Sequence, residues 1–181
     1  MGRPRYPRGM TTVSLRHLRL RPGQEHREQV ALELEPFVLG GVRYEPISQV
    51  PAELVVQRAT SGDVYGLRFT TRVEGPCMRC LGDASVEVAV DAREYSSSDP
   101  TADEELRSEY VRDGELDVGA WAHDQIALSL PEPILCRPDC AGLCPVCGKN
   151  LNDEPHEHEE DASDPRWAAL EALRSDAADD R

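Results

Sequence analysis

The sequence has few aromatic residues and no long hydrophobic run. Phenylalanine, tryptophan and tyrosine make up 5% of its 181 residues and hydrophobic residues 39%, which predicts one domain with a small core. No stretch approaches the roughly eighteen apolar residues that span a bilayer, and no apolar segment follows the N-terminal arginines as in a signal peptide. We therefore expect a cytoplasmic protein with no membrane partner, whose six cysteines stay reduced and able to bind a metal.

The sequence also lacks the common catalytic motifs. It contains no glycine-rich phosphate loop, no serine with a nearby histidine and no convincing pair of carboxylates. Zinc deaminases require a Pro-Cys pair, whereas here Cys144 precedes Pro145. We predict that the protein is not an enzyme and has no small-molecule substrate.

The net charge is negative but unevenly distributed. It totals −14, yet residues 1–27 are rich in arginine, whereas residues 152–164 and 175–181 are mostly acidic. Phosphate is repelled by most of such a surface, so basic proteins are the expected partners. Initiation at Met10 instead of Met1 would shorten the basic segment. Local contacts with RNA or a partner would use Arg16, Arg19, Arg21 and Arg79.

Apolar residues at every second position predict strands in the first half of the chain. A short first strand is expected at 13–15, and others around 30–34 and 54–56. The clearest strand places Tyr65, Leu67, Phe69, Thr71 and Val73 on one face. Gly75-Pro76 should end it, and the turn at 77–80 should lead into a partner strand that contains Val86, Val88, Val90 and Ala92.

Helices are expected in the second half. Asp117 is a suitable N-cap for a helix to about Ser129, and Pro131 would end it. A short helix is also predicted at 103–110, and another at 164–174.

The predicted domain organisation follows from these elements. The domain covers 13–152, preceded by a flexible basic N-terminus at 1–12. An acidic disordered linker at 153–163, the helix at 164–174 and a disordered acidic tail at 175–181 follow it. The predicted fold class is α+β, an antiparallel β-rich body with a few short helices and a cysteine-rich zinc-binding segment.

The six cysteines lie in two short segments, at 77–80 and 136–147. The first reads Cys77-Met78-Arg79-Cys80, and the second ends in Cys144-Pro145-Val146-Cys147-Gly148. Two such CxxC pairs are typical of a zinc site in which each turn supplies two thiolates. Glycine after the last cysteine favours positive φ, which would turn backbone N–H groups toward sulfur. The pattern predicts one structural zinc ion.

One tetrahedral zinc takes four thiolates, so three partitions of the six cysteines are open. The first combines Cys77 and Cys80 with Cys144 and Cys147. The second uses Cys136, Cys140, Cys144 and Cys147, and the third uses Cys77, Cys80, Cys136 and Cys140. A two-zinc cluster with shared thiolates is less favoured. The CPxCG sequence favours a site that contains Cys144 and Cys147.

Other interpretations of these residues must be weighed. A CPxC sequence can be a redox pair when its first thiolate lies at a helix N-terminus, but Gly148 and Asn150 disfavour a helix there. A thiol-disulfide oxidoreductase or an RNA-processing enzyme that uses the CxxC pairs is the alternative function. His156 and His158 could complete a metal site, although in so polar a segment solvated side chains are the favoured interpretation.

Several motifs together resemble those of the YceD family, the large ribosomal RNA subunit accumulation proteins. They are Cys77-Met78-Arg79-Cys80-Leu81, Leu128-Ser129-Leu130-Pro131, the run from Cys140 to Asn152 that contains CPVCGKNLN, and Asp164-Pro165-Arg166-Trp167. The resemblance extends from Val13 to Arg174. It implies a bacterial factor that promotes accumulation or maturation of large-subunit rRNA, acting on the pre-large-subunit particle through a basic ribosomal protein or rRNA.

Overall fold

The computed structural model describes residues 11–158. Of these, residues 11–140 belong to one compact unit and residues 141–158 to a second. Several predictions fall outside the described part: the N-terminus up to residue 10, residues 159–163 of the linker, the helix at 164–174 and the tail at 175–181.

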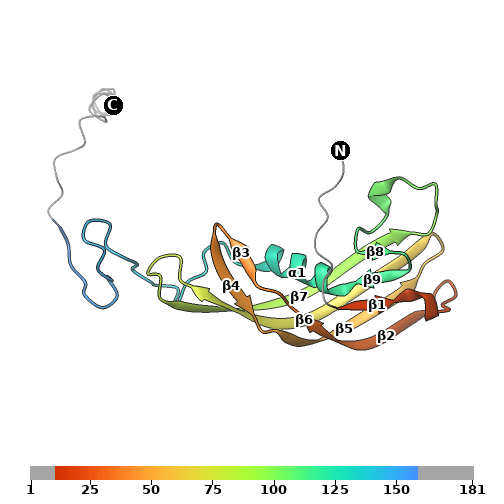
Figure 1. The fold of residues 1–181 in the computed structure, drawn as a ribbon, viewed down its shortest axis with the longest axis horizontal. Helices are drawn as coiled ribbons and strands as arrows, with labels where there is room; N and C mark the ends of the chain where they lie inside the picture. The colour runs from red at the N-terminus through yellow and green to blue at the C-terminus, as the bar shows by residue number, and fades with distance from the viewer. Residues whose placement is uncertain (1–10, 159–181) are drawn as a thin grey trace, which may run out of the picture. The chain divides into compact units, whose positions relative to one another are not determined.

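The first unit is built on an antiparallel sheet of six strands (Figure 1). These are β2 (Glu25–Glu33), β3 (Phe37–Leu39), β4 (Val42–Pro46), β5 (Gln49–Arg58), β6 (Gly62–Pro76) and β7 (Asp83–Ser97). On one edge of β6, β5 pairs with the first half and β4 with Val73 and Glu74. On the other edge, β7 pairs with β6 from Gly62 to Pro76. β6 is therefore the central strand, and β2 pairs with the far edge of β5.

The alternating pattern predicted for β6 is confirmed. Its core-facing side chains, Tyr65, Leu67, Phe69, Thr71 and Val73, are all buried. The strand ends at Pro76, as the Gly75-Pro76 pair predicted. Gly75 also makes room for packing, since a Cβ atom there would lie 2.2 Å from Cδ1 of Tyr44. The glycine lets the Tyr44 ring pack directly on the β6 backbone.

A smaller sheet adjoins the helix of this unit. It has the order β1-β9-β8, with β1 at Thr12–Ser14, β8 at Val111–Arg112 and β9 at Glu115–Asp117. The helix predicted at 103–110 is wrong, because only a 3-10 turn, η2 (Glu104–Leu106), forms there. Local side-chain hydrogen bonds, such as that from Tyr110 N to Ser108 Oγ at 3.3 Å, compete with helical ones. A second 3-10 turn, η1 (Leu15–His17), follows β1.

The predicted helix after Asp117 is confirmed as α1 (Val118–Ser129). The Asp117 carboxylate accepts a hydrogen bond from Ala120 N at 2.9 Å, as an N-cap should. The helix contacts β1, β2 and β7 and lies on one side of the large sheet (Figure 1). Within residues 11–158, no helix is long and apolar enough to cross a bilayer.

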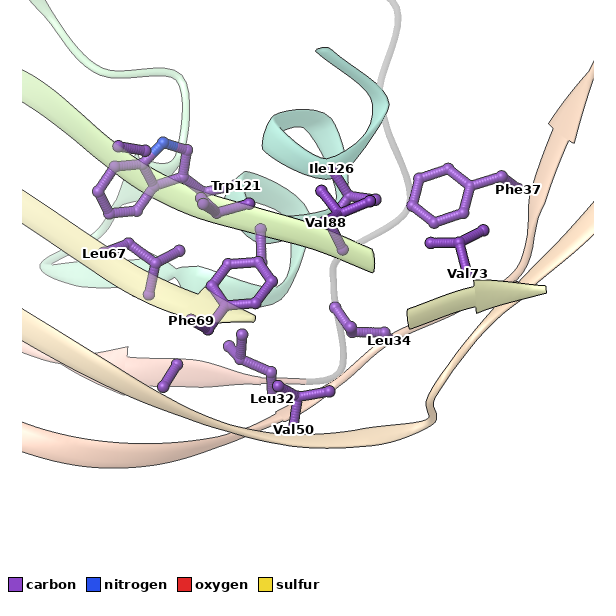
Figure 2. Close-up of a cluster of buried hydrophobic side chains, with 14 of the residues drawn as sticks. Leu32, Leu34, Phe37, Val50, Leu67, Phe69, Val73, Val88, Trp121 and Ile126 are labelled. Atoms are coloured by element: carbon purple, nitrogen blue, oxygen red, sulfur yellow. The ribbon is translucent and has the colours of Figure 1, made fainter. Parts of the chain in front are cut away.

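The core of the first unit lies between α1 and the sheet. Trp121 and Ile126 of α1 point toward Leu67, Phe69 and Val88 of the strands (Figure 2). Trp121 is 0% exposed, and its ring centroid lies 6.2 Å from that of Tyr110. Because the chain has few large apolar residues, much of the helix-to-sheet packing depends on this one side chain.

Replacing Trp121 with alanine should therefore destabilise the first unit strongly. A buried Trp→Ala change costs about 3–5 kcal/mol through lost transfer energy and the cavity left behind. Leu128→Ala is the matched control, since Leu128 is in the same helix but 79% exposed, and should change stability by less than about 0.5 kcal/mol. Urea unfolding followed by circular dichroism measures both, and equal losses in the two variants would contradict this packing.

Candidate metal centre and acidic cavity

The turn between β6 and β7 carries the first cysteine pair, as the sequence predicted. Cys77 N donates to Gly82 O at 2.7 Å, and Leu81 N donates to Cys77 O at 3.0 Å. Leu81 has φ of 61°, a left-handed conformation that is unusual for leucine. The tight turn places Cys77 and Cys80 on the same side, with Cys77 buried.

The segment after α1 brings Cys136 and Cys140 to this turn. Met78 N donates to Ile134 O at 2.9 Å, and Ile134 is buried. The Arg79 guanidinium donates through Nη1 to Cys140 O at 2.9 Å. These contacts from two successive turn residues hold the chain around Cys136 and Cys140 against the end of the β6–β7 hairpin.

The four thiols of this cluster are spaced as a zinc ion requires. Sγ of Cys77 lies 3.8 Å from Sγ of Cys140, and Sγ of Cys80 lies 3.7 Å from Sγ of Cys136. With Zn–S bonds of about 2.3 Å, a tetrahedral ion holds its sulfur atoms about 3.8 Å apart. A disulfide would need about 2.05 Å, and the six cysteines form no disulfide with one another. The four cysteines therefore fit a zinc ion. They are the set Cys77, Cys80, Cys136 and Cys140, which is the third partition that the sequence allows.

Backbone N–H groups favour the charged form of one of these thiols. Burial alone raises the pKa of Cys77, but the N–H groups of Cys80, Cys136 and Arg79 outweigh it and lower the pKa to about 6. Arg79 N lies 3.4 Å from Cys77 Sγ. N–H groups aimed at a ligand sulfur are the usual surroundings of a bound thiolate.

This cluster suits a structural metal site and not a catalytic one. Four thiolates fill the coordination shell of a tetrahedral ion, which leaves no position for water or substrate. A cation here would join the β6–β7 turn to the segment after α1, and its binding free energy would add to folding.

The remaining cysteines lie in a second group, in the unit at 141–158. Ligand atoms of Cys144, Cys147, His156 and His158 all lie within 4.8 Å of one another. The sequence favours a single metal site in which Cys144 and Cys147 join other cysteines. It also favours solvated side chains for His156 and His158. The structure instead forms two groups, because the chain after Cys147 turns back and brings the histidine rings to the thiols. The HxH spacing was a signal for this arrangement.

The arginines proposed to contact RNA are placed differently from one another. Arg79 is tied to Cys140 O, and Arg16 Nε donates to Asp113 O at 2.9 Å. Both therefore bridge segments that are far apart in the sequence. Arg19 and Arg21 are exposed and precede β2 in the chain.

A cavity of about 340 Å³ lies beside the start of α1 in the first unit. Two arginines, Arg16 and Arg112, line it. Its acidic side chains belong to Glu33, Glu35, Glu109, Asp113, Glu115, Asp117 and Asp124. Asp117 caps α1, and Asp124 accepts a hydrogen bond from Tyr110 at 3.0 Å, whereas the other five extend the negative surface. With seven carboxylates against two guanidinium groups, the cavity favours a cationic ligand.

Comparison with known proteins supports a family assignment. The sequence profile of the family described as "Large ribosomal RNA subunit accumulation protein YceD" matches residues 66–174. An uncharacterized protein of Mycobacterium tuberculosis is 36% identical over 124 residues, which cover 65% of this chain and 58% of the relative. An uncharacterized protein of Mycobacterium leprae is 36% identical over 123 residues, 65% of this chain and 56% of the relative. The chain thus spans less than two thirds of these relatives, and no solved structure matches it significantly.

Cys77→Ser should abolish metal binding at the four-thiolate cluster and destabilise the first unit, because the free energy of binding adds to that of folding. The measurements are metal content by mass spectrometry and the urea midpoint. Met78→Ala is the matched control, since Met78 lies in the same turn but is 62% exposed. Full metal retention by Cys77→Ser would contradict the assignment of this ligand.

Proposed function

Since the chain belongs to the YceD family of large ribosomal RNA subunit accumulation proteins, we propose that it is a non-enzymatic factor in biogenesis of the large ribosomal subunit. It would act in the cytoplasm on the pre-large-subunit particle. In this role it binds a basic ribosomal protein and promotes accumulation or maturation of large-subunit rRNA. The observation that carries the choice of partner is the acidic cavity beside α1.

The cavity suits a basic peptide segment. Ribosomal proteins that contact rRNA expose lysine and arginine side chains, and these are repelled by one another until the RNA neutralises them. A cavity lined by seven carboxylates gives such side chains a temporary counter-charge. The framework around it, the β1-β9-β8 sheet and the capped start of α1, would position the carboxylates for binding.

Direct binding of rRNA is less favoured by the same surface. The net charge of −14 repels phosphate, and two of the arginines expected to contact RNA bridge segments of the fold instead. Arg19 and Arg21 supply only a small basic surface by comparison. RNA contact is therefore the competing outcome of the binding test below.

A non-enzymatic role is supported by the surroundings of the thiols. Redox CxxC pairs place the first thiolate at a helix N-terminus, whereas Cys80 is followed by the turn into β7, and Cys147 by Gly148 with φ of 73°. The lowered pKa of Cys77 would also aid nucleophilic chemistry, but this sulfur is 0% exposed and faces three other thiols.

Neutralising part of the cavity should weaken binding to a basic ribosomal protein. For Glu33→Gln combined with Glu115→Gln, we expect about a five- to ten-fold rise in Kd, equivalent to roughly 1–1.4 kcal/mol. The measurement is titration of the full chain with a panel of purified large-subunit ribosomal proteins, at two salt concentrations. Because the attraction is electrostatic, wild-type binding should weaken as salt rises.

The matched control removes the same charge outside the cavity. Glu87→Gln combined with Asp91→Asn alters two exposed residues of β7, neither of which lines the cavity, and should leave Kd within about two-fold. Equal weakening in both double variants would show that binding depends on the net charge of the protein and not on the cavity. If the chain binds rRNA fragments without any ribosomal protein, and loses this binding when Arg19 and Arg21 are changed, its partner is RNA and not a ribosomal protein.

A further inference from the structure

The second group of ligands is complete without any residue of the four-thiolate cluster. Cys77, Cys80, Cys136 and Cys140 account for four of the six thiols, and their sulfur atoms can close one coordination shell. The other two thiols belong to Cys144 and Cys147. They lie with two histidines inside the unit at 141–158.

Backbone hydrogen bonds shape the cysteine loop of this unit into a knuckle. Cys144 N donates to Lys149 O and Gly148 N donates to Cys144 O, both at 2.8 Å. Gly148 has φ of 73°, which lets the chain reverse after Cys147. An isolated β-bridge between Leu143 and Asn150 closes the base of the loop. This short hairpin holds both sulfur atoms on one side, and Cys144 is buried.

A second turn returns the chain to the knuckle. Glu154 N donates to Asn150 O at 3.0 Å, and Lys149 Nζ lies 2.6 Å from Glu154 Oε2. Asn150 Nδ2 also donates to Asp153 Oδ2 at 2.7 Å. Of these residues, Asp153 and Glu154 belong to the segment that the charge pattern alone assigns to a disordered linker. The effect of these contacts is to carry His156 back to the two thiols.

The hydrogen bond of His156 leaves the ring nitrogen that faces the thiols able to bind a cation. His156 Nδ1 lies 2.7 Å from Glu154 O, and because a carbonyl can only accept, Nδ1 carries the proton. In the neutral ring, Nε2 then has a lone pair, and it lies 3.1 Å from Cys147 Sγ. Metal-binding histidines are commonly oriented by this type of bond to a backbone carbonyl.

His158 supplies the fourth donor. Its ring packs edge-on against that of His156, with centroids 4.9 Å apart. A simple thiol–imidazole hydrogen bond would involve only Cys147 and His156, and would not require His158 or Cys144 to converge on the same point. A tetrahedral zinc would hold sulfur and nitrogen about 3.6 Å apart, so binding requires only a small separation of the Cys147–His156 pair.

We infer that Cys144, Cys147, His156 and His158 form a second, independent metal site for a borderline-soft divalent cation such as Zn²⁺. Thiolate and imidazole donors select this class over Mg²⁺ or Ca²⁺, which take oxygen ligands. Two thiolates balance the charge of the ion, so the site is neutral when filled. The protein then binds two metal ions, and this inference does not rest on the proposed function.

The test is metal content together with cobalt spectroscopy on the full chain. Wild-type protein purified without chelator should contain about two zinc ions per chain, and Cys144→Ser about one. Replacement of zinc by Co²⁺ should give the spectra of two tetrahedral sites. The sulfur-to-cobalt charge-transfer band reports bound thiolates, so Cys77→Ser should retain only the weaker band of a two-thiolate site.

The histidine variants separate ligation from folding. His156→Ala and His158→Ala should each weaken zinc binding at the second site at least about ten-fold, while the four-thiolate site stays filled. His158 is exposed, so its replacement should not unfold the chain. His17→Ala is the matched control, since His17 is an exposed histidine in η1, far from this unit in the sequence.

Three results would overturn the inference. The first is about one zinc in wild-type protein, retained by Cys144→Ser. The second is a single zinc that both Cys77→Ser and Cys144→Ser lose, which would show a shared site. The third is two zinc ions with unchanged affinity and cobalt spectra in both histidine variants, which would show that other groups complete the site.

Discussion

A cation held by four thiols from distant parts of the chain would be the constraint on which the first unit depends. Cys77 and Cys140 are separated by 63 residues, and Cys80 and Cys136 by 56. Between these pairs lie β7, the strands β8 and β9, and α1, which covers the core. A cation at this point would close a loop that contains β7, the principal partner strand of β6, together with α1. Closure of a long loop limits the freedom of the unfolded chain, which favours the folded state.

The sequence predicted those elements whose patterns are long or chemically distinctive. Period-two alternation located β6 and β7, and an N-cap aspartate with a later proline bounded α1. The hairpins β3–β4 and β8–β9 were missed because strands of two to five residues are too short to show a period. Their turns carried a usable signal. Gly40-Gly41 and Asp113-Gly114 have positive φ at both positions, as two-residue hairpin turns require.

The six candidate metal-binding cysteines could be identified from their spacing, but the way they divide into two groups could not. Which thiols meet depends on where the segment after α1 runs, and that is decided by contacts such as Met78 N with Ile134 O. The acidic neighbours of His156 and His158 in the sequence also led to the expectation that both side chains are solvated. A run of acidic residues around His156 predicts a solvated chain, yet local hydrogen bonds of Asn150 and Glu154 fold it back. Such bonds are made by common polar residues and leave no periodic signal.

The acidic cavity and the cysteine clusters have opposite effects on the stability of the fold. Carboxylates that would attract a basic partner also repel one another, and this repulsion opposes compactness. A chain with few aromatic residues has little apolar surface with which to offset it. Metal coordination would hold distant segments together without enlarging the core or covering the acidic surface. A basic partner would relieve the same repulsion, so it would bind the folded chain in preference to the unfolded one and stabilise it further.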